Sequence, residues 1–475
     1  MRPGVERTAR KPAGRRRRLI IAAAFPFLAA AVLVPVLVSA RGGRVSFDGP
    51  HQSAIAGPQR PYAFLAAFDV TARGRDGLRD MFLALTEQGR ALVRGTAASD
   101  GGPESLPPGD TGETLGFRTA GLSLAFGVGP GLFDAKYGTE GMKPAALREL
   151  PAFQGDLLDA AWTGGDLVVL ATADDLQAAY HAVHGLSRAL KGYAVPRWVQ
   201  QGFLPNGEAN PRGTGRNLQG FRDGTVNPDV RDAKAMDRVV WIGDGEPGWT
   251  RGGTYMAMRR FRMLVEVWDR SSLADQERTI GRERDTGAPL GKDGEREDFD
   301  PTELPQDSHV ALARENGGAG LLRRSYNFVD GLDPLTGQWD SGLVFLGFMK
   351  NPDTQFIPLQ AALSRSDALN EYVKAEGSAL FFMLPGSAPG SYVGAGLVPP
   401  PDESAVIETL QSGLGGLASA LRTGRTAEIP GRLAAVTGPW ETARRAGTFP
   451  DGFRKRFPRA PRPDPQGSSR RSLQH

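Results

Sequence analysis

Between residues 61 and 400 the chain alternates between the two-residue hydrophobic repeat of strands and the three-to-four-residue repeat of amphipathic helices. In the segment 76–93, Leu78, Phe82 and Leu85 fall on one face of a helix. The expected strands are 62–70, 122–128, 166–171, 195–203, 253–269, 342–349 and 378–384. The expected helices are 76–93, 173–190, 272–282, 354–363 and 367–374. This order predicts two β-α-β-rich halves of similar size, a duplicated α+β unit with antiparallel sheets.

The N-terminus has the composition of a targeting segment. Four consecutive arginines, Arg15–Arg18, precede an uncharged apolar stretch over 19–40, and Val38-Ser39-Ala40 has the small residues of a signal-peptidase site. Adjacent arginines before such a stretch favour the twin-arginine export route. The stretch also reaches the ~20 residues that span a bilayer, so an uncleaved anchor is the alternative. We expect residues 1–43 to be a signal peptide or membrane anchor, and the protein to work outside the cytoplasm, secreted or attached to the cell envelope.

The other domain boundaries follow changes in composition. Residues 44–60 are polar with Gly and Pro and are expected to form a linker, followed by an N-terminal half over 61–228 and a C-terminal half over 229–400. The segment 283–305 is rich in charge, Gly and Pro and predicts a surface loop. Residues 401–475 are expected to form a helix over 405–421 and then a basic Pro/Arg-rich tail, which we interpret as solvated, with a basic surface-binding segment as the alternative.

Composition and absent motifs exclude several classes of site. The 475 residues include no cysteine, which excludes disulfides, thiolate metal sites and cysteine nucleophiles. The net charge is only +4 and much of the excess lies at the two ends, which argues against a nucleic-acid-binding core. No Walker loop, GxSxG elbow or HExxH helix occurs. Imidazole chemistry has five candidates, which are His51, His181, His184, His309 and His475.

Two of these histidines lie close together on a predicted helix. His181 and His184 are three residues apart and could share a face. No carboxylate at a matching spacing accompanies them, so the sequence gives only weak support for a metal site. We interpret both as residues of the helix surface or the edge of the core.

The segment from Gly220 to Pro228 is the strongest local candidate for chemistry. It holds one acid, Asp223, between Gly220 and Gly224, and Asn227-Pro228 stops any regular element. A carboxylate on such a strained turn is often positioned for function, although Asp-Gly is also an ordinary turn signal.

Two further features are weaker when taken alone. His309 follows the charged loop directly, and Arg323 and Arg324 close an apolar run. A packed histidine and a solvated arginine pair are the more common structural explanations for such residues.

Taken in order, these segments resemble one family. Asn217 to Pro228 resembles the signature of dye-decolorizing peroxidases, whose GxxDG motif matches Gly220–Gly224 position by position. The resemblance runs from about residue 61 to 397 and is similar to the exported branch, which includes the deferrochelatase/peroxidase of iron-uptake systems. The other matching stretches are 252–255, Arg259–Arg260, 266–273, 308–309, 322–326, 355–360 and 366–372.

The resemblance implies one b-type haem per chain, enclosed by two ferredoxin-like halves of the dimeric α/β barrel type. It implies that His309 is the proximal iron ligand and that Asp367 accepts a hydrogen bond from the His309 imidazole. It also implies that Asp223 and Arg323 are the distal pair. Leu343 and Phe345 would be the apolar residues over the haem. Position favours Arg323 over Arg324 as the arginine that faces the haem. Relatives often carry arginine where this chain has Ala311, so Arg314 or Arg324 would have to replace that contact to a haem propionate.

The implied activity is reduction of hydrogen peroxide and oxidation of an organic reductant. Asp223 would move the peroxide proton, and Arg323 would stabilise the negative charge that develops during O–O cleavage. Two alternatives stay open, namely a haem-handling protein that releases iron and a non-haem binding module on the same fold. The sequence does not identify the reductant or the oligomeric state, and the expected contact with a membrane is limited to the N-terminal segment. The aromatic residues Trp241, Trp249, Trp268, Trp339 and Tyr326 could relay electrons, although buried aromatics are usually core residues.

Overall fold

The computed structural model describes residues 45–96, 105–205, 214–244, 246–401 and scattered residues between 412 and 437. The predicted signal peptide or anchor at 1–43 lies outside these residues, as does most of the predicted 401–475 extension. The chain divides into two units, 1–44 and 45–475, and the description below concerns the second. Among the described residues, no helix has both the length and the apolar character needed to cross a membrane.

The N-terminal half is a ferredoxin-like βαββαβ unit. Its elements are β1 (Tyr62–Val70), α3 (Gly74–Arg94), β2 (Ser123–Val128), β3 (Leu167–Ala173), α4 (Leu176–Ala189) and β4 (Ala194–Phe203). The strands are antiparallel and lie in the order β2-β3-β1-β4. This is the strand order of a split βαβ fold, in which two helices cover one face of the sheet.

The C-terminal half repeats the same topology. Its strands are β5 (Thr254–Met263), β6 (Leu322–Arg323), β7 (Tyr326–Leu332), β8 (Trp339–Met349) and β9 (Val373–Met383). Its helices are α5 (Ala233–Val239), α6 (Val265–Trp268), α7 (Leu273–Ile280), α8 (His309–Glu315), α9 (Pro352–Gln355) and α10 (Ile357–Ser366). The order β9-β5-β8-β7 corresponds to that of the first half, so the predicted duplication is confirmed.

The two sheets join into one closed antiparallel barrel. At one seam Gly127 and Val128 of β2 pair with β9, and at the other Phe203 of β4 pairs with Asn327 of β7. The barrel interior holds a large apolar cluster, with Leu65, Trp198 and other side chains from the inward faces of the strands. Because successive side chains of a strand point to opposite faces, the outward-facing residues are free to pack against helices.

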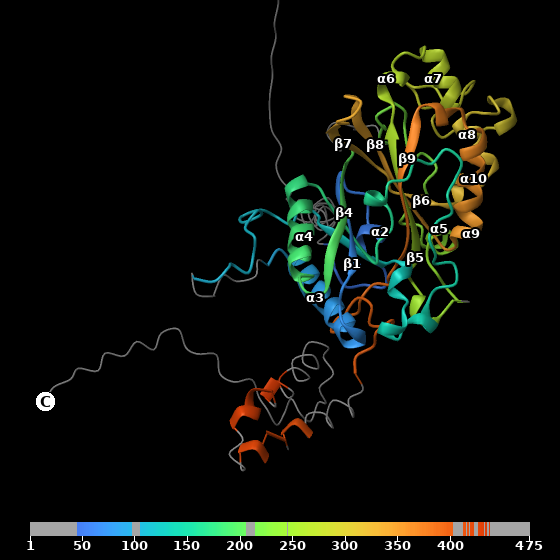
Figure 1. Ribbon diagram of the computed structural model, residues 1–475. Helices are drawn as coiled ribbons and strands as arrows, with labels where there is room; N and C mark the ends of the chain where they lie inside the picture. The colour runs from blue at the N-terminus through green and yellow to red at the C-terminus, as the bar shows by residue number, and fades with distance from the viewer. Residues whose placement is uncertain are drawn as a thin grey trace, which may run out of the picture. The chain divides into compact units, whose positions relative to one another are not determined.

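The halves differ in what lies between sheet and helices. In the first half, outward-facing Phe68 and Phe126 belong to one continuous apolar core with Leu78 and Phe82 of α3. In the second half, a pocket lies between the outward faces of β5 and β8 and the helices α8 and α10. Figure 1 shows α3 and α4 on one side of the strands and α8 and α10 on the other. The second half therefore carries a cavity where the first half carries packed side chains.

Three of the predicted elements of this half are wrong in extent. The strand predicted over 253–269 ends at Met263, and α6 follows it. The helix predicted over 354–363 is split at Phe356 into α9 and α10, because Pro358 starts a new helical turn. The helix predicted over 367–374 is only the 3₁₀ turn Ala368–Glu371, capped by Asp367, and β9 begins at Val373.

The segment predicted as a linker is part of the folded body. Within 44–60, the short helix α2 (Ser53–Ala56) buries Ile55, and Gln52 is also buried. The Gln52 amide nitrogen donates to the carbonyl oxygens of Phe126 and Leu384, each at 2.8 Å. The polar composition predicted a linker, but the Gln52 side chain donates hydrogen bonds to buried backbone groups of the folded body.

Candidate active site

The GxxDG segment forms a tight turn that presents Asp223. Gly220 and Gly224 have φ angles of +89° and +103°, which side chains with a Cβ rarely adopt. The Asn217 side-chain oxygen accepts from the backbone N–H groups of Gln219 and Phe221, each at 3.1 Å. The Asn217 side chain therefore fixes the backbone of the turn, and Asp223 follows these residues.

This turn is bonded directly to the strand that carries Arg323. The Asn227 side chain donates to the Arg323 carbonyl oxygen at 2.7 Å and accepts from the Arg323 N–H at 2.9 Å. Asn227 and Arg323 lie 96 residues apart in the chain, so the paired bonds set the distance between two remote segments. The sequence predicted Asn227 only as a residue that ends regular structure.

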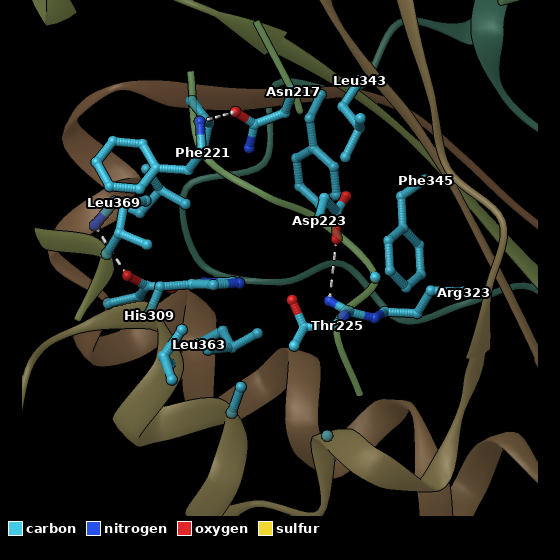
Figure 2. A pocket seen from close by; sticks show the side chains of 18 of the residues that line it. Asn217, Phe221, Asp223, Thr225, His309, Arg323, Leu343, Phe345, Leu363 and Leu369 are labelled. Atoms are coloured by element: carbon cyan, nitrogen blue, oxygen red, sulfur yellow. Dashed lines mark hydrogen bonds and ion pairs between the residues drawn. The ribbon is translucent and has the colours of Figure 1, made fainter. Parts of the chain in front are cut away.

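Asp223 and Arg323 form an ion pair at the pocket wall. An Arg323 guanidinium nitrogen lies 3.3 Å from the Asp223 carboxylate, and each side chain is about a quarter exposed. Among the described residues, the Arg323 Nε has no hydrogen-bond partner. The pair forms a polar part of the pocket lining, and Figure 2 shows the two side chains directed toward each other.

His309 faces this pair from the opposite side of the pocket. It is the first residue of α8, and its Nδ1 lies 2.6 Å from a carboxylate oxygen of buried Asp367. The other Asp367 oxygen accepts from the Leu369 N–H at 2.8 Å, which fixes the carboxylate. Because Nδ1 is occupied, Nε2 is the ring nitrogen left to act in the pocket, and Figure 2 shows the ring directed inward.

The charges around His309 favour a strongly basic imidazole. Burial alone would lower the pKa of His309, but the adjacent Asp367 carboxylate outweighs burial and raises that pKa. Arg323 and Asp223 also act on the ring, with opposite signs, which is consistent with their facing it across the pocket. A carboxylate behind an imidazole raises the basicity of the ring as a metal ligand.

The rest of the pocket is largely apolar. Leu343 and Phe345, both predicted, extend from the outward face of β8, and Phe345 stacks on Phe356 with ring centroids 5.8 Å apart. Other apolar lining residues, which sequence reasoning did not assign to the site, include Phe261, Met263, Val310, Leu359, Leu363 and Leu369. In the sequence these residues show only the periodicity of helices and strands, because an apolar residue that faces a cavity follows the same pattern as one that faces the core.

Arg324 is not a pocket residue, which corrects the prediction that it contacts the cofactor. Its side chain is buried on the other face of the strand, where it donates to the carbonyl oxygens of Ile55 (2.9 Å) and Gly57. Burial lowers the pKa of Arg324 to about 10. Arg314, the other predicted replacement at the propionate position, does line the pocket and pairs with Asp298 at 2.6 Å.

Replacing Arg324 with alanine is expected to destabilise the fold while the folded protein keeps its pocket. The change leaves two carbonyl oxygens without their donor, and we expect a loss of about 3 kcal/mol in the free energy of unfolding. Chemical denaturation measures that loss, and haem content of the folded fraction tests the pocket. If the variant were fully stable but lacked haem, Arg324 rather than Arg323 would be the arginine of the pocket.

The charged segment 283–305 is a largely exposed loop, as predicted, and part of it packs onto the GxxDG turn. Glu295 pairs with Arg222 and accepts from the Thr225 hydroxyl at 3.0 Å. Phe299 from the same segment lines the pocket. The buried Arg282, just before it, also lines the pocket and donates to the backbone of the segment at Gly287, 2.6 Å away. High charge predicted solvent exposure, and most charged residues of the segment are exposed, but Glu295 pairs with Arg222 of the turn.

Comparison with known proteins covers most of the chain. The family model described as Dyp-type peroxidase, N-terminal, matches residues 52–204, and that described as Dyp-type peroxidase, C-terminal, matches residues 214–388. The deferrochelatase of Escherichia coli strain K12 is 36% identical over 362 residues, which cover 73% of this chain and 85% of that protein. The chain belongs to the Dyp-type peroxidase family.

Solved structures of Dyp-type peroxidases have the same fold. DtpA from Streptomyces lividans is 33% identical with a TM-score of 0.70, over 76% of this chain and 99% of that one. The DyP-type peroxidase from Cellulomonas bogoriensis is 35% identical with a TM-score of 0.68, over 75% of this chain and 98% of that one. This Dyp-type peroxidase is therefore a haem enzyme that uses peroxide and a reductant, as predicted.

The pocket of this Dyp-type peroxidase fits a haem. Apolar side chains of β8 and α10 line the pocket. The His309 imidazole also lines it, and the Asp367 carboxylate fixes the orientation of that ring. Arg314 and Arg282 provide positive charge at the lining, which suits the carboxylates of a porphyrin. Asp223 and Arg323 form a polar surface opposite the His309 imidazole. Polar groups on the side of the haem away from the proximal ligand are what peroxide binding at the iron requires.

Proposed function

We propose that the pocket holds one haem b per chain, with His309 Nε2 as the protein's iron ligand. The hydrogen bond between His309 Nδ1 and Asp367, at 2.6 Å, is the single observation that carries this proposal. The bond gives the imidazole the orientation and basicity of a haem ligand. Leu343 and Phe345 cover the opposite face, and Arg314 is our choice for the propionate contact.

The residues opposite His309 are suited to moving a proton on bound peroxide. Asp223 accepts a proton from one peroxide oxygen and returns it to the other, which leaves as water. Arg323, which lines the pocket, holds the negative charge that develops on the departing oxygen. The haem, when bound, supplies the electrons for O–O cleavage and is reduced again by an organic donor.

The fixed geometry of the distal pair supports this division of roles. Asp223 lies on a turn with two positive φ angles, and Arg323 is joined to that turn through Asn227. Both groups are therefore held in place before peroxide arrives, which lowers the cost of reorganisation during the reaction.

A second candidate function is release of iron from haem with incidental peroxidase activity. It is favoured by one observation, the 36% identity to proteins named deferrochelatase over three quarters of this chain. The apolar walls and the His309–Asp367 pair suit either use, because both require bound haem.

The experiment that tests the proposal is an absorption spectrum of the purified protein followed by titration with hydrogen peroxide and an organic dye. We expect a haem spectrum with one haem per chain, and dye oxidation that depends on peroxide. Iron and free porphyrin would be measured after incubation with haem but without peroxide. Their appearance would favour the deferrochelatase function, whereas a protein that binds no haem would contradict both.

We further propose that the enzyme is exported by the twin-arginine route and works outside the cytoplasm. Arg15–Arg18 and the uncharged stretch over 19–40 support this proposal. Cell fractionation of the native host tests it, and the mass of the mature protein distinguishes a cleaved signal from an anchor. A protein found wholly in the cytoplasm would contradict export.

A further inference from the structure

A second cluster of titratable side chains lies in the N-terminal half, outside the haem pocket. Asp110 and Glu113, in the segment before β2, meet His181 and His184 on α4. None of the four lines the haem pocket, so the peroxidase chemistry does not use them. They lie about 70 residues apart in the chain, and only the fold brings them together.

Three of the four side chains are within ligand distance of one another, and His184 contacts Glu113. One ligand atom each from Asp110, Glu113 and His181 lies within 4.8 Å of the other two. The Glu113 carboxylate contacts His181 Nδ1 at 2.8 Å with one oxygen and His184 Nδ1 at 2.6 Å with the other. His181 Nε2 lies 3.6 Å from Asp110. Ligands around tetrahedral zinc are ~3.3 Å apart, so small side-chain rotations would fit the ion.

The cluster concentrates negative charge in a shielded place. The Asp110 and His181 side chains are each 9% exposed, and Glu113 is 21% exposed. Within the described residues, the ion-pair partners of both carboxylates are histidines only. Shielded carboxylates of this kind are usually paired with a fixed cation or bind a metal.

We propose that Asp110, Glu113 and His181 bind a divalent transition metal of the Zn²⁺ type. Imidazole and carboxylate are ligands that zinc accepts, and three protein ligands leave a position for water. His184 holds the second oxygen of Glu113, the outer hydrogen bond that orients a ligating carboxylate. Binding would displace the protons that imidazoles and carboxylates now share.

The site has room for the ion and its water. Asp110 and His181 both line a partly open cavity of about 120 Å³, between the end of α3, the segment around 114–119 and α4. This is space for several water molecules. A metal could therefore enter from solvent without opening the apolar core.

The proposed metal would fasten the segment before β2 to α4. The described contacts there are side-chain bonds, such as the Arg188 guanidinium to the Pro108 carbonyl at 2.8 Å. A metal joining Asp110 and Glu113 to His181 would add a stronger connection at the same place. Its role would be structural, because the residues of the peroxide site lie elsewhere.

The test is calorimetric titration of Zn²⁺ into the haem-loaded, full-length, tag-free protein after removal of metals with a chelator. We expect one Zn²⁺ per chain, with Ca²⁺ giving no comparable signal because imidazole is a poor calcium ligand. Glu113→Gln and Asp110→Asn keep side-chain shape and should lose the binding. His184→Ala should weaken it by roughly 10–100-fold, as loss of an outer partner does.

Arg188→Ala is the matched control, since it removes another attachment of the same segment but no ligand. It should bind Zn²⁺ within a few-fold of the parent. The proposal is overturned if the parent binds no Zn²⁺, if Glu113→Gln and Asp110→Asn bind like the parent, or if Arg188→Ala loses binding as they do. Haem content of every variant checks folding, and anomalous scattering at the zinc edge locates the ion.

Discussion

The His309→Ala protein is expected to be purified without haem, or with haem that is lost on gel filtration. The His309 imidazole is the ligand that we propose for the iron, and its Nδ1 lies 2.6 Å from the Asp367 carboxylate. We expect haem affinity to fall by more than ~100-fold, beyond the effect of removing an outer hydrogen-bond partner. The ratio of the Soret band to protein absorbance measures the loss.

Two controls distinguish loss of the ligand from loss of the fold. His51→Gln removes an imidazole that stacks on Trp241 outside the pocket, and it should keep haem. Free imidazole added to His309→Ala should restore part of the binding, because the space of the missing ring remains between Asp367 and the pocket. An undiminished Soret band in His309→Ala would refute the ligand assignment.

Asp223→Ala and Arg323→Ala are expected to bind haem normally but to react slowly with hydrogen peroxide. Positioned proton transfer and charge stabilisation each contribute about 10²–10⁴-fold to such reactions, so we expect a decrease of at least ~100-fold for either variant. Because the two side chains form one ion pair, the double variant should be little slower than the single ones. Stopped-flow spectroscopy of the first spectral change after mixing with peroxide measures the rate.

Asp229 and Arg231 provide a matched pair for comparison. They form an exposed Asp–Arg ion pair a few residues after the turn, at 2.8 Å and outside the pocket. Asp229→Ala and Arg231→Ala should react with peroxide at the parental rate. Parental rates in both Asp223→Ala and Arg323→Ala would mean that another group moves the proton.

The distal turn could be predicted from sequence because its constraints are local. Two glycines and an Asn-Pro pair permit few backbone conformations, and Gly220 and Gly224 do adopt positive φ. The topology could be predicted only in part from periodicity, because the expected strands correspond to β1 to β4 of the first half and β5, β8 and β9 of the second, but β7 (Tyr326–Leu332) was not predicted. The interior of the second half could not be predicted, since residues facing a cavity have the same apolar pattern as residues facing a core.

The choice between Arg323 and Arg324 illustrates what a sequence leaves open. Adjacent residues of an extended strand point to opposite faces, so one arginine had to face away from the pocket. Which one did so depended on register, and Arg323 pairs with Gly347 of β8 on the pocket side. Position in the family favoured Arg323, whereas the contacts of Arg324 with Ile55 and Gly57 could not be foreseen from a segment expected to be a linker.

The side-chain cluster that we propose as a metal site could not be predicted from the sequence for a different reason. His181 and His184 were visible at helical spacing, but no carboxylate follows at the next turn of α4. Asp110 and Glu113 come from an irregular segment whose path no periodicity predicts. Long-range loop packing, not local pattern, creates the ligand set.

The cavity in the second half gives the cofactor a structural role as well as a chemical one. In the first half the space between sheet and helices is filled by phenylalanine and leucine side chains, whereas in the second half it is the haem pocket. A bound haem would therefore supply apolar surface that the polypeptide itself lacks at that position. Any ligand specific for the folded state stabilises it, by about 2.7 kcal/mol at a hundredfold excess over its dissociation constant. Haem binding would therefore add to the stability of this half, so haem supply would influence how much of the protein is folded as well as how much is active.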